Sequence, residues 1–125
     1  MKLTIQGTIP SKKNSKQIFY NRKTNRPFLS SSKRYKEWHA ITIPQLLQKA
    51  PQEPIKHATI ALLFYIKAKY KKDLTNMAES IMDILVDAKI LEDDNMFIIP
   101  ELHLHYFECE KGDDRVEIEI EKLTK

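Results

Sequence analysis

Apolar and polar residues alternate along the 125-residue chain with the period of strands in some stretches and of helices in others. Near the start, Leu3, Ile5 and Gly7 alternate with polar residues, a pattern typical of a half-buried strand. The expected elements, in chain order, are a strand over residues 3–7, a hairpin of residues 17–20 and 26–29, a helix over 33–49, a strand over 56–67, a helix over 74–89 and a closing hairpin of residues 97–108 and 115–123. This order predicts an α+β protein, a single domain (1–125) in which two main helices pack on a mixed β-sheet.

Three of these elements carry more specific expectations. The apolar run over residues 58–66, interrupted only by Thr59, predicts a central strand that is buried on both faces. Pro44 lies inside the first expected helix, where it lacks an amide N–H, and it predicts a kink or a break there. Between the last two strands, residues 111–114 contain Gly112, which adopts a positive φ at little cost and favours a hairpin turn.

Composition excludes several classes of protein. Apolar residues make up 42% of the chain, which is sufficient for a hydrophobic core. The longest mainly apolar run, Ala58 to Ile66, is far shorter than the roughly 20 residues of a membrane-spanning helix, so we expect no membrane partner. The chain has no recognisable secretory signal, and its one cysteine, Cys109, forms neither an internal disulfide nor a cysteine-based zinc site. We therefore expect a soluble protein of the cytoplasm.

Charge is divided unevenly along the sequence. Residues 1–40 contain ten Lys or Arg and one Glu, whereas residues 73–125 contain five basic and fifteen acidic residues. A strongly basic block is typical of proteins that bind a phosphate backbone. Alternatively, the two blocks simply pair with each other at the surface, and from charge alone both interpretations stay open.

The helix expected over residues 74–89 has an apolar face and an acidic face. The polar residues that share the second face at intervals of three or four are Asn76, Glu79, Asp83 and Asp87. Like charges at this spacing destabilise a helix slightly, so stability alone does not favour them. Asp73 precedes the helix and Asp94 follows it, and we expect Asp73, Asp83 and Asp94 to converge. Clustered carboxylates suit Mg²⁺, which activates water and stabilises the leaving oxygen in phosphodiester hydrolysis.

Purely structural roles for the same residues stay open. Asn76 followed by Glu79 resembles a capping box, in which Glu79 only binds a backbone N–H group. Asp73 or Thr75 is an equally suitable N-cap, and residues 93–95 are typical of a solvated turn.

Taken together, these motifs resemble the RusA family of Holliday-junction resolvases (crossover junction endodeoxyribonucleases). The family pattern is D-x-D-N, a lysine three residues later, D-x-L on the same helix, and D-D after a short loop. The matching segments here are Asp73-Leu-Thr-Asn76, Glu79 in the lysine position, Asp83-Ile-Leu85 and Asp93-Asp94. Residues 7–14 and 35–38 and the closing hairpin resemble the family's first strand and loop, first helix and last hairpin.

The resemblance implies a homodimeric, Mg²⁺-dependent endonuclease that resolves four-way DNA junctions by paired nicks in DNA recombination and repair. It implies catalytic and metal-binding roles for Asp73, Asp83 and Asp94. Two positions depart from the family pattern, because Thr75 replaces an aspartate and Glu79 replaces the lysine. Our hypothesis is that Glu79, about one helical turn beyond Thr75, replaces the missing metal ligand.

The basic residues supply the candidate DNA contacts. These are Lys12, Lys13, Asn14, Lys16, Arg22, Lys71 and Lys72. Lys71 or Lys72 is also a candidate to replace the family lysine that Glu79 displaces. The rival hypothesis is a module that binds branched DNA without cutting it, in which the acidic site is degenerate.

Overall fold

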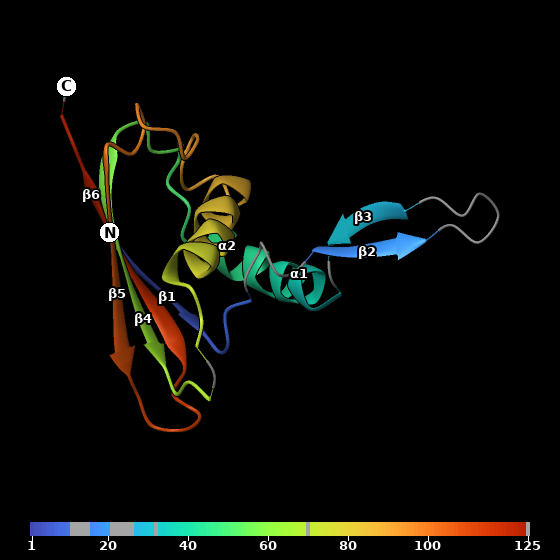
Figure 1. The fold of residues 1–125 in the computed structure, drawn as a ribbon. Helices are drawn as coiled ribbons and strands as arrows, with labels where there is room; N and C mark the ends of the chain where they lie inside the picture. The colour runs from blue at the N-terminus through green and yellow to red at the C-terminus, as the bar shows by residue number, and fades with distance from the viewer. Residues whose placement is uncertain (11–15, 21–26, 32, 70, 125) are drawn as a thin grey trace.

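The computed structural model describes residues 1–10, 16–20, 27–31, 33–69 and 71–124 (Figure 1). Its elements in chain order are β1 (Lys2–Gln6), β2 (Lys16–Tyr20), β3 (Pro27–Ser31), α1 (Lys33–Leu47), β4 (Ala58–Ile66), α2 (Leu74–Asp87), β5 (Glu101–Glu108) and β6 (Arg115–Lys122). Each predicted helix and strand is present. The predicted α+β fold, with two helices and a mixed sheet in one small domain, is confirmed.

Four strands form the mixed sheet, in the order β1-β6-β4-β5. Strand β6 pairs antiparallel with both β1 and β4, whereas β5 runs parallel to β4 at one edge. Strands β2 and β3 form a separate antiparallel hairpin, as predicted. Figure 1 shows α1 and α2 on the same side of the sheet, so neither of the two covers its other side.

The hydrophobic core lies between the sheet and α2. The inward side chains of β4, Ile60, Leu62 and Phe64, have no exposed surface, and neither do Ile81 and Ile84 of α2. The apolar face predicted for this helix is therefore confirmed. Burial of this face sets the rotation of α2 about its axis, and that rotation decides where its acidic side chains point.

The predicted closing hairpin is wrong. Strands β5 and β6 do not pair with each other, because β6 inserts between β1 and β4 while β5 lies on the far side of β4. Gly112 has the expected positive φ of 90°, but the turn carries the chain past the end of β4. Burial explains why β6, and not β5, takes the central position: Val116 and Ile118 of β6 are fully buried, and a central position covers them. Most of β5 is exposed, as an edge strand tolerates.

Two further expectations need correction. Along β4, fully buried residues alternate with half-buried ones, so only the side facing the helices is fully buried. Neither α1 nor α2 covers the other side, and its side chains pack laterally, as where Tyr65 stacks on Phe107 with ring centroids 5.1 Å apart. Helix α1 continues through Pro44 without a break. Packing of the following turn, where Leu46 is only 2% exposed, offsets the hydrogen bond that proline removes.

Candidate active site

Asp73 occupies the N-cap position of α2. Its backbone is extended, with φ −84° and ψ 124°, and its carbonyl oxygen accepts a hydrogen bond from the Met77 N–H at 3.3 Å. The carboxylate does not cap the helix; instead, its Oδ2 accepts a hydrogen bond from Asn76 Nδ2 at 3.2 Å. The capping-box interpretation of Asn76 and Glu79 is therefore wrong, because Asn76 lies buried inside the first turn. Asp73 remains exposed and its carboxylate is oriented by Asn76.

The acidic face of α2 divides between two neighbours. Asp83 and Asp87 lie one turn apart beside α1, where Asp83 Oδ2 accepts a hydrogen bond from Tyr35 Oη at 2.9 Å. One turn further along both helices, His39 Nε2 donates to Asp87 Oδ2 at 2.8 Å. Glu79 lies on the other flank of α2, in a pocket beside β5. The acidic face thus serves both a helix–helix contact and a pocket.

The pocket beside β5 has a volume of about 290 Å³ and contains two carboxylates. Glu79 and Thr75 line it from α2, and Asp94 lines it from the loop that follows the helix. Leu102 and Leu104 of β5 form its apolar wall. We call this recess the acidic pocket. Glu79 and Asp94 therefore line the same pocket, whereas the carboxylates near enough to raise the pKa of Asp94 are those of Asp93 and Asp83.

Local hydrogen bonds give the neighbouring residues Asp93 and Asp94 different roles. Asp93 Oδ1 accepts the Asp94 N–H at 2.8 Å and Asp93 Oδ2 accepts Asn95 Nδ2 at 2.9 Å, and these bonds lower the pKa of Asp93. Burial first, then the neighbouring Asp93, and more weakly the charge of Asp83 raise the pKa of Asp94. Asp93 therefore fixes the turn, and Asp94 is the carboxylate of the pocket.

The predicted convergence of Asp73, Asp83 and Asp94 on one point is not observed. Among the described residues, no group of three His, Cys, Asp or Glu side chains lies close enough together to hold a metal ion. Asp73 and Asp83 are ten positions apart, which corresponds to about 15 Å along a helix axis. Asp83 is near enough to Asp94 to affect its pKa, but its carboxylate bonds Tyr35 of α1.

A second pocket, of about 650 Å³, adjoins the acidic pocket at the start of α2. Lys69, Lys71 and Lys72 line it together with Asp73, and Tyr106 of β5 forms a wall. We call it the lysine pocket. Adjacent residues of α2 line different pockets: Leu74 lines the lysine pocket and Thr75 lines the acidic pocket. Both pockets border β5. They therefore follow one another along the seam between α2 and the sheet edge.

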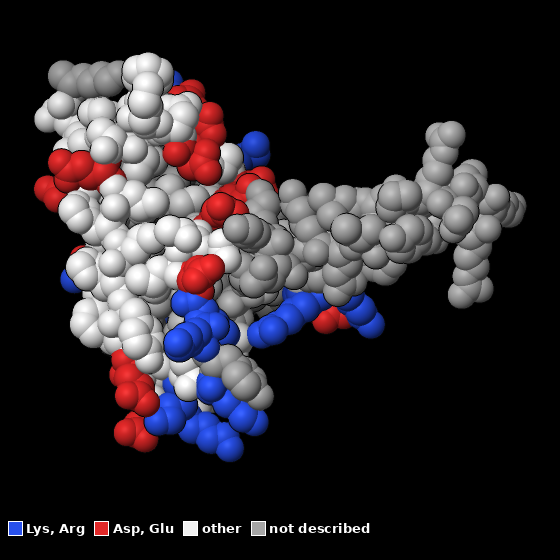
Figure 2. All heavy atoms as spheres, in the orientation of Figure 1, with Lys and Arg blue, Asp and Glu red and all other residues white. Residues whose placement is uncertain are grey.

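Positive charge gathers where the lysine pocket lies. Figure 2 shows blue side chains concentrated low on this face, where Figure 1 places the chain between β4 and α2. The predicted contacts Lys71 and Lys72 are in this pocket, as is Lys69, which was not among the predicted contacts although it belongs to the same basic run. Tyr106 was also not identified, because nothing in its sequence context distinguishes it from a core residue.

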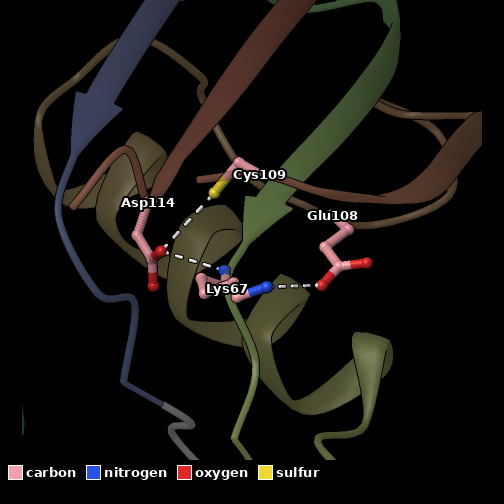
Figure 3. A network of polar contacts seen from close by, with 4 residues as sticks. All are labelled: Lys67, Glu108, Cys109 and Asp114. Atoms are coloured by element: carbon pink, nitrogen blue, oxygen red, sulfur yellow. Dashed lines mark hydrogen bonds and ion pairs between the residues drawn. The ribbon is translucent and has the colours of Figure 1, made fainter. Parts of the chain in front are cut away.

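The chain that carries these lysines leaves the end of β4, where polar contacts between the ends of three strands hold it (Figure 3). The Lys67 N–H donates to Asp114 Oδ1 at 3.0 Å, and Lys67 Nζ binds Glu108 Oε1 at 2.9 Å. Cys109 Sγ contacts the same Asp114 oxygen at 3.5 Å. The bond to Glu108 raises the pKa of Lys67. These contacts fix the point at which the chain leaves β4 for the lysine pocket.

The remaining predicted DNA contacts are not placed by the structure. Lys12, Lys13, Asn14 and Arg22 lie outside the described residues, and Lys16 is the first residue of β2, with its side chain outside the described part. Their proposed roles therefore stay predictions.

The Tyr35–Asp83 contact predicts a measurable alkaline titration. Burial, followed by the hydrogen bond to Asp83, raises the pKa of Tyr35 well above its ordinary value of 10.0. Since the folded-state pKa is the higher one, this contribution to stability is complete below pH 10 and is lost as the pH rises through the folded-state pKa. The difference in phenolate absorbance between wild type and Tyr35→Phe should therefore appear only well above pH 10. Titration of Tyr35 at its ordinary pKa would contradict the contact.

A family comparison decides what kind of protein carries these pockets. A protein-family model described as Endodeoxyribonuclease RusA matches residues 8–121, which include both pockets and all of the predicted acidic residues. The chain belongs to the RusA family. Membership of the RusA family implies an endonuclease, a hydrolase acting on DNA, with Holliday-junction resolvase activity. A search of the curated proteins gave no significant match. Within the described part of this RusA-family chain, no helix is long and apolar enough to span a membrane.

Proposed function

We propose that this RusA-family chain is a Mg²⁺-dependent endonuclease that resolves four-way DNA junctions by paired nicks during recombination and repair. The observation that carries the proposal is the adjacency of the acidic and lysine pockets along one seam. A sugar–phosphate strand lying in this seam would meet lysines at one end and carboxylates at the other. Because paired nicks require two active sites, we propose a homodimer as the working form.

The acidic pocket fits the small ligand set of a magnesium site. Mg²⁺ typically takes one or two carboxylates from the protein and completes its shell with water and substrate phosphate. Glu79 and Asp94 supply two carboxylates in one pocket, and their neighbours Asp83 and Asp93 add negative charge that favours a cation there. Asp73, predicted as a further ligand, lies in the adjoining lysine pocket. We therefore assign Asp94 and Glu79 to the metal and leave Asp73 beside the bound strand.

The chain's own groups position the substrate in this mechanism. Lys69, Lys71 and Lys72 attract the phosphates, and their charges favour the bound strand without reading its bases. Asp94 is held at the pocket by the turn that Asp93 fixes, so little rearrangement is needed when the strand arrives. When bound, Mg²⁺ supplies Lewis-acid activation of water and of the scissile phosphate.

Cleavage of a synthetic four-way junction tests the proposal directly. We expect symmetric nicks in opposite strands with Mg²⁺, none with a chelator, and no cleavage of a linear duplex of the same sequence. Binding should weaken steeply with added salt, because lysine–phosphate contacts release condensed counterions. Unchanged cleavage in chelator would exclude the metal mechanism.

The hypothesis that Glu79 replaces the missing family aspartate gives a separate prediction. Glu79→Ala should lower Mg²⁺-dependent cleavage by at least roughly 10- to 100-fold, which is the cost of losing a group that only supports a metal ligand. It should also raise the Mg²⁺ concentration needed for half-maximal rate. Glu92→Ala is the matched control, because Glu92 is exposed and follows the same helix. Full cleavage by Glu79→Ala would refute the hypothesis.

The second candidate function is non-catalytic binding of branched DNA. Two observations favour it: Thr75 replaces a family carboxylate, and the described residues contain no group of three metal-binding side chains. This candidate predicts junction binding that is equally tight with and without Mg²⁺, and no nicking at any metal concentration. The junction-cleavage assay therefore distinguishes the two functions.

A further inference from the structure

We propose that the lysine pocket accepts one unstacked nucleotide of the branched DNA, with the base against Tyr106 and the phosphate on the lysines. The inference builds on the proposed function, because it assumes that branched DNA lies along the seam. It adds to that function a site that senses departure from regular duplex structure.

The size of the pocket suits a single nucleotide. Its volume of about 650 Å³ lies within the roughly 300–1,000 Å³ typical of sites for small organic ligands. A recess of this size is too small for a duplex, whose bases remain paired and stacked. A single base that has left the stack is of a size to enter it.

The lining of the pocket is divided as a nucleotide is, into an apolar and a charged part. Ile66 and Met77 form an apolar floor, and they are 5% and 2% exposed. The ring of Tyr106 stands beside this floor and is 49% exposed. An aromatic ring of this kind stacks on any base, since every base has a π face.

The exposure of Tyr106 follows from its place in the fold. The preceding residues on the same side of β5, Leu102 and Leu104, line the acidic pocket beside the body of α2. Tyr106 lies near the start of α2, where the helix provides less cover. Packing of the core does not require an aromatic ring at this position, whereas stacking on a base does.

The charged part of the pocket complements a phosphate. The described lining residues include the ammonium groups of Lys69, Lys71 and Lys72 against the single carboxylate of Asp73. These lysines are exposed and lie above the apolar floor. A nucleotide with its base on Tyr106 would thus place its phosphate among cations. The strand that continues from it would reach the acidic pocket next along α2.

Such a pocket would confer selectivity for branched DNA. Extruding a base from an intact duplex costs a few kcal/mol, and the cost is least where the base is already unpaired or unstacked. In an open four-way junction, the base pairs at the branch point have no stacked neighbour on one side, so extruding one of their bases costs less than it does in a duplex. Occupation of the pocket would therefore favour a junction over a duplex and align the junction strand with the carboxylates.

Tyr106→Ala tests the proposal, with binding to a four-way junction and to a linear duplex measured separately. The junction carries 2-aminopurine at its branch point, whose fluorescence reports stacking. We expect Tyr106→Ala to weaken junction binding by roughly 5- to 150-fold, with duplex binding unchanged. The fluorescence change seen with wild type should be lost.

Two variants serve as controls. Tyr106→Phe keeps the ring and should retain both the affinity and the fluorescence change. Phe107→Ala removes an exposed aromatic residue from the other side of the same strand, where it stacks on Tyr65, and should retain them too. Thermal unfolding of each variant verifies that it is folded.

The outcomes separate this inference from the proposed function. If wild type cleaves junctions but Tyr106→Ala keeps the full preference for junction over duplex, the nucleotide pocket is refuted and the nuclease stands. If wild type does not cleave but the preference and the fluorescence change depend on the Tyr106 ring, the pocket stands and the nuclease is refuted. A wild-type chain that binds junctions no better than duplex overturns the pocket as well.

Discussion

Replacing Asp94 by asparagine is expected to reduce Mg²⁺-dependent junction cleavage by more than the roughly 100-fold that loss of an outer-shell partner costs a metal site. Asparagine keeps the size of the side chain but removes its negative charge, so the acidic pocket keeps only the Glu79 carboxylate among its described lining residues. Junction binding should be retained or slightly strengthened, because a negative charge beside the DNA strand is lost. Single-turnover cleavage and a binding titration with the same junction measure the two effects.

Asp87→Asn is the matched control for this result. It makes the same chemical change on α2, but Asp87 faces α1 and hydrogen-bonds His39, away from both pockets. We expect this variant to cleave at nearly the wild-type rate. Equal losses in Asp94→Asn and Asp87→Asn would mean that general charge, and not the pocket, governs cleavage.

Replacing Phe64 by alanine should have the largest effect on stability. Phe64 is fully buried in the central strand β4, and truncation of such a side chain costs about 3–5 kcal/mol of the free energy of unfolding. For a domain of this size, the melting temperature should fall by on the order of 10 °C or more. Leu63→Ala tests the other side of the same strand, where the side chain is half-buried, and should cost less. Equal losses would contradict the one-sided core.

The helices and strands were predictable because the signals that define them are local. The apolar spacing over α2 predicts both the helix and its buried face, and the turn residues around Gly112 predict a positive φ. One boundary moved for an equally local reason: β5 starts later than expected because Asn95 Oδ1 accepts hydrogen bonds from the N–H groups of Phe97 and Ile98. The turn formed by these hydrogen bonds takes up the first residues of the strand expected over 97–108.

Strand pairing was not predictable in the same way. The hairpin expectation for β5 and β6 used their nearness in sequence, whereas the pairing depends on which strand has the more deeply buried side chains. The burial of Thr42 and Leu46, two residues before and after Pro44 on α1, and the missing cover on one side of β4 are likewise properties of the assembled fold.

In the candidate site, too, some features were predictable from the sequence and others depended on the assembled fold. The motif from Asp73 to Asp94 predicted the family, which the comparison confirmed. The hypothesis that Glu79 replaces the missing metal ligand stays a prediction, and the structure places Glu79 and Asp94 in the lining of one pocket. The motif did not predict that Asp83 would turn towards Tyr35, or that Tyr106 would stand beside the lysines. These facts depend on α1 and β5, which are remote in sequence from the motif.

The sequence by itself determined the element types, the buried face of α2, the basic and acidic blocks and the family, since each is encoded by neighbouring residues or by a motif. Only the tertiary structure decided the order of the strands and the division of the acidic residues between α1 and the seam beside β5. The physical reason is that burial of the apolar face fixes the rotation of α2, and the neighbours that pack around it then determine what each remaining carboxylate meets.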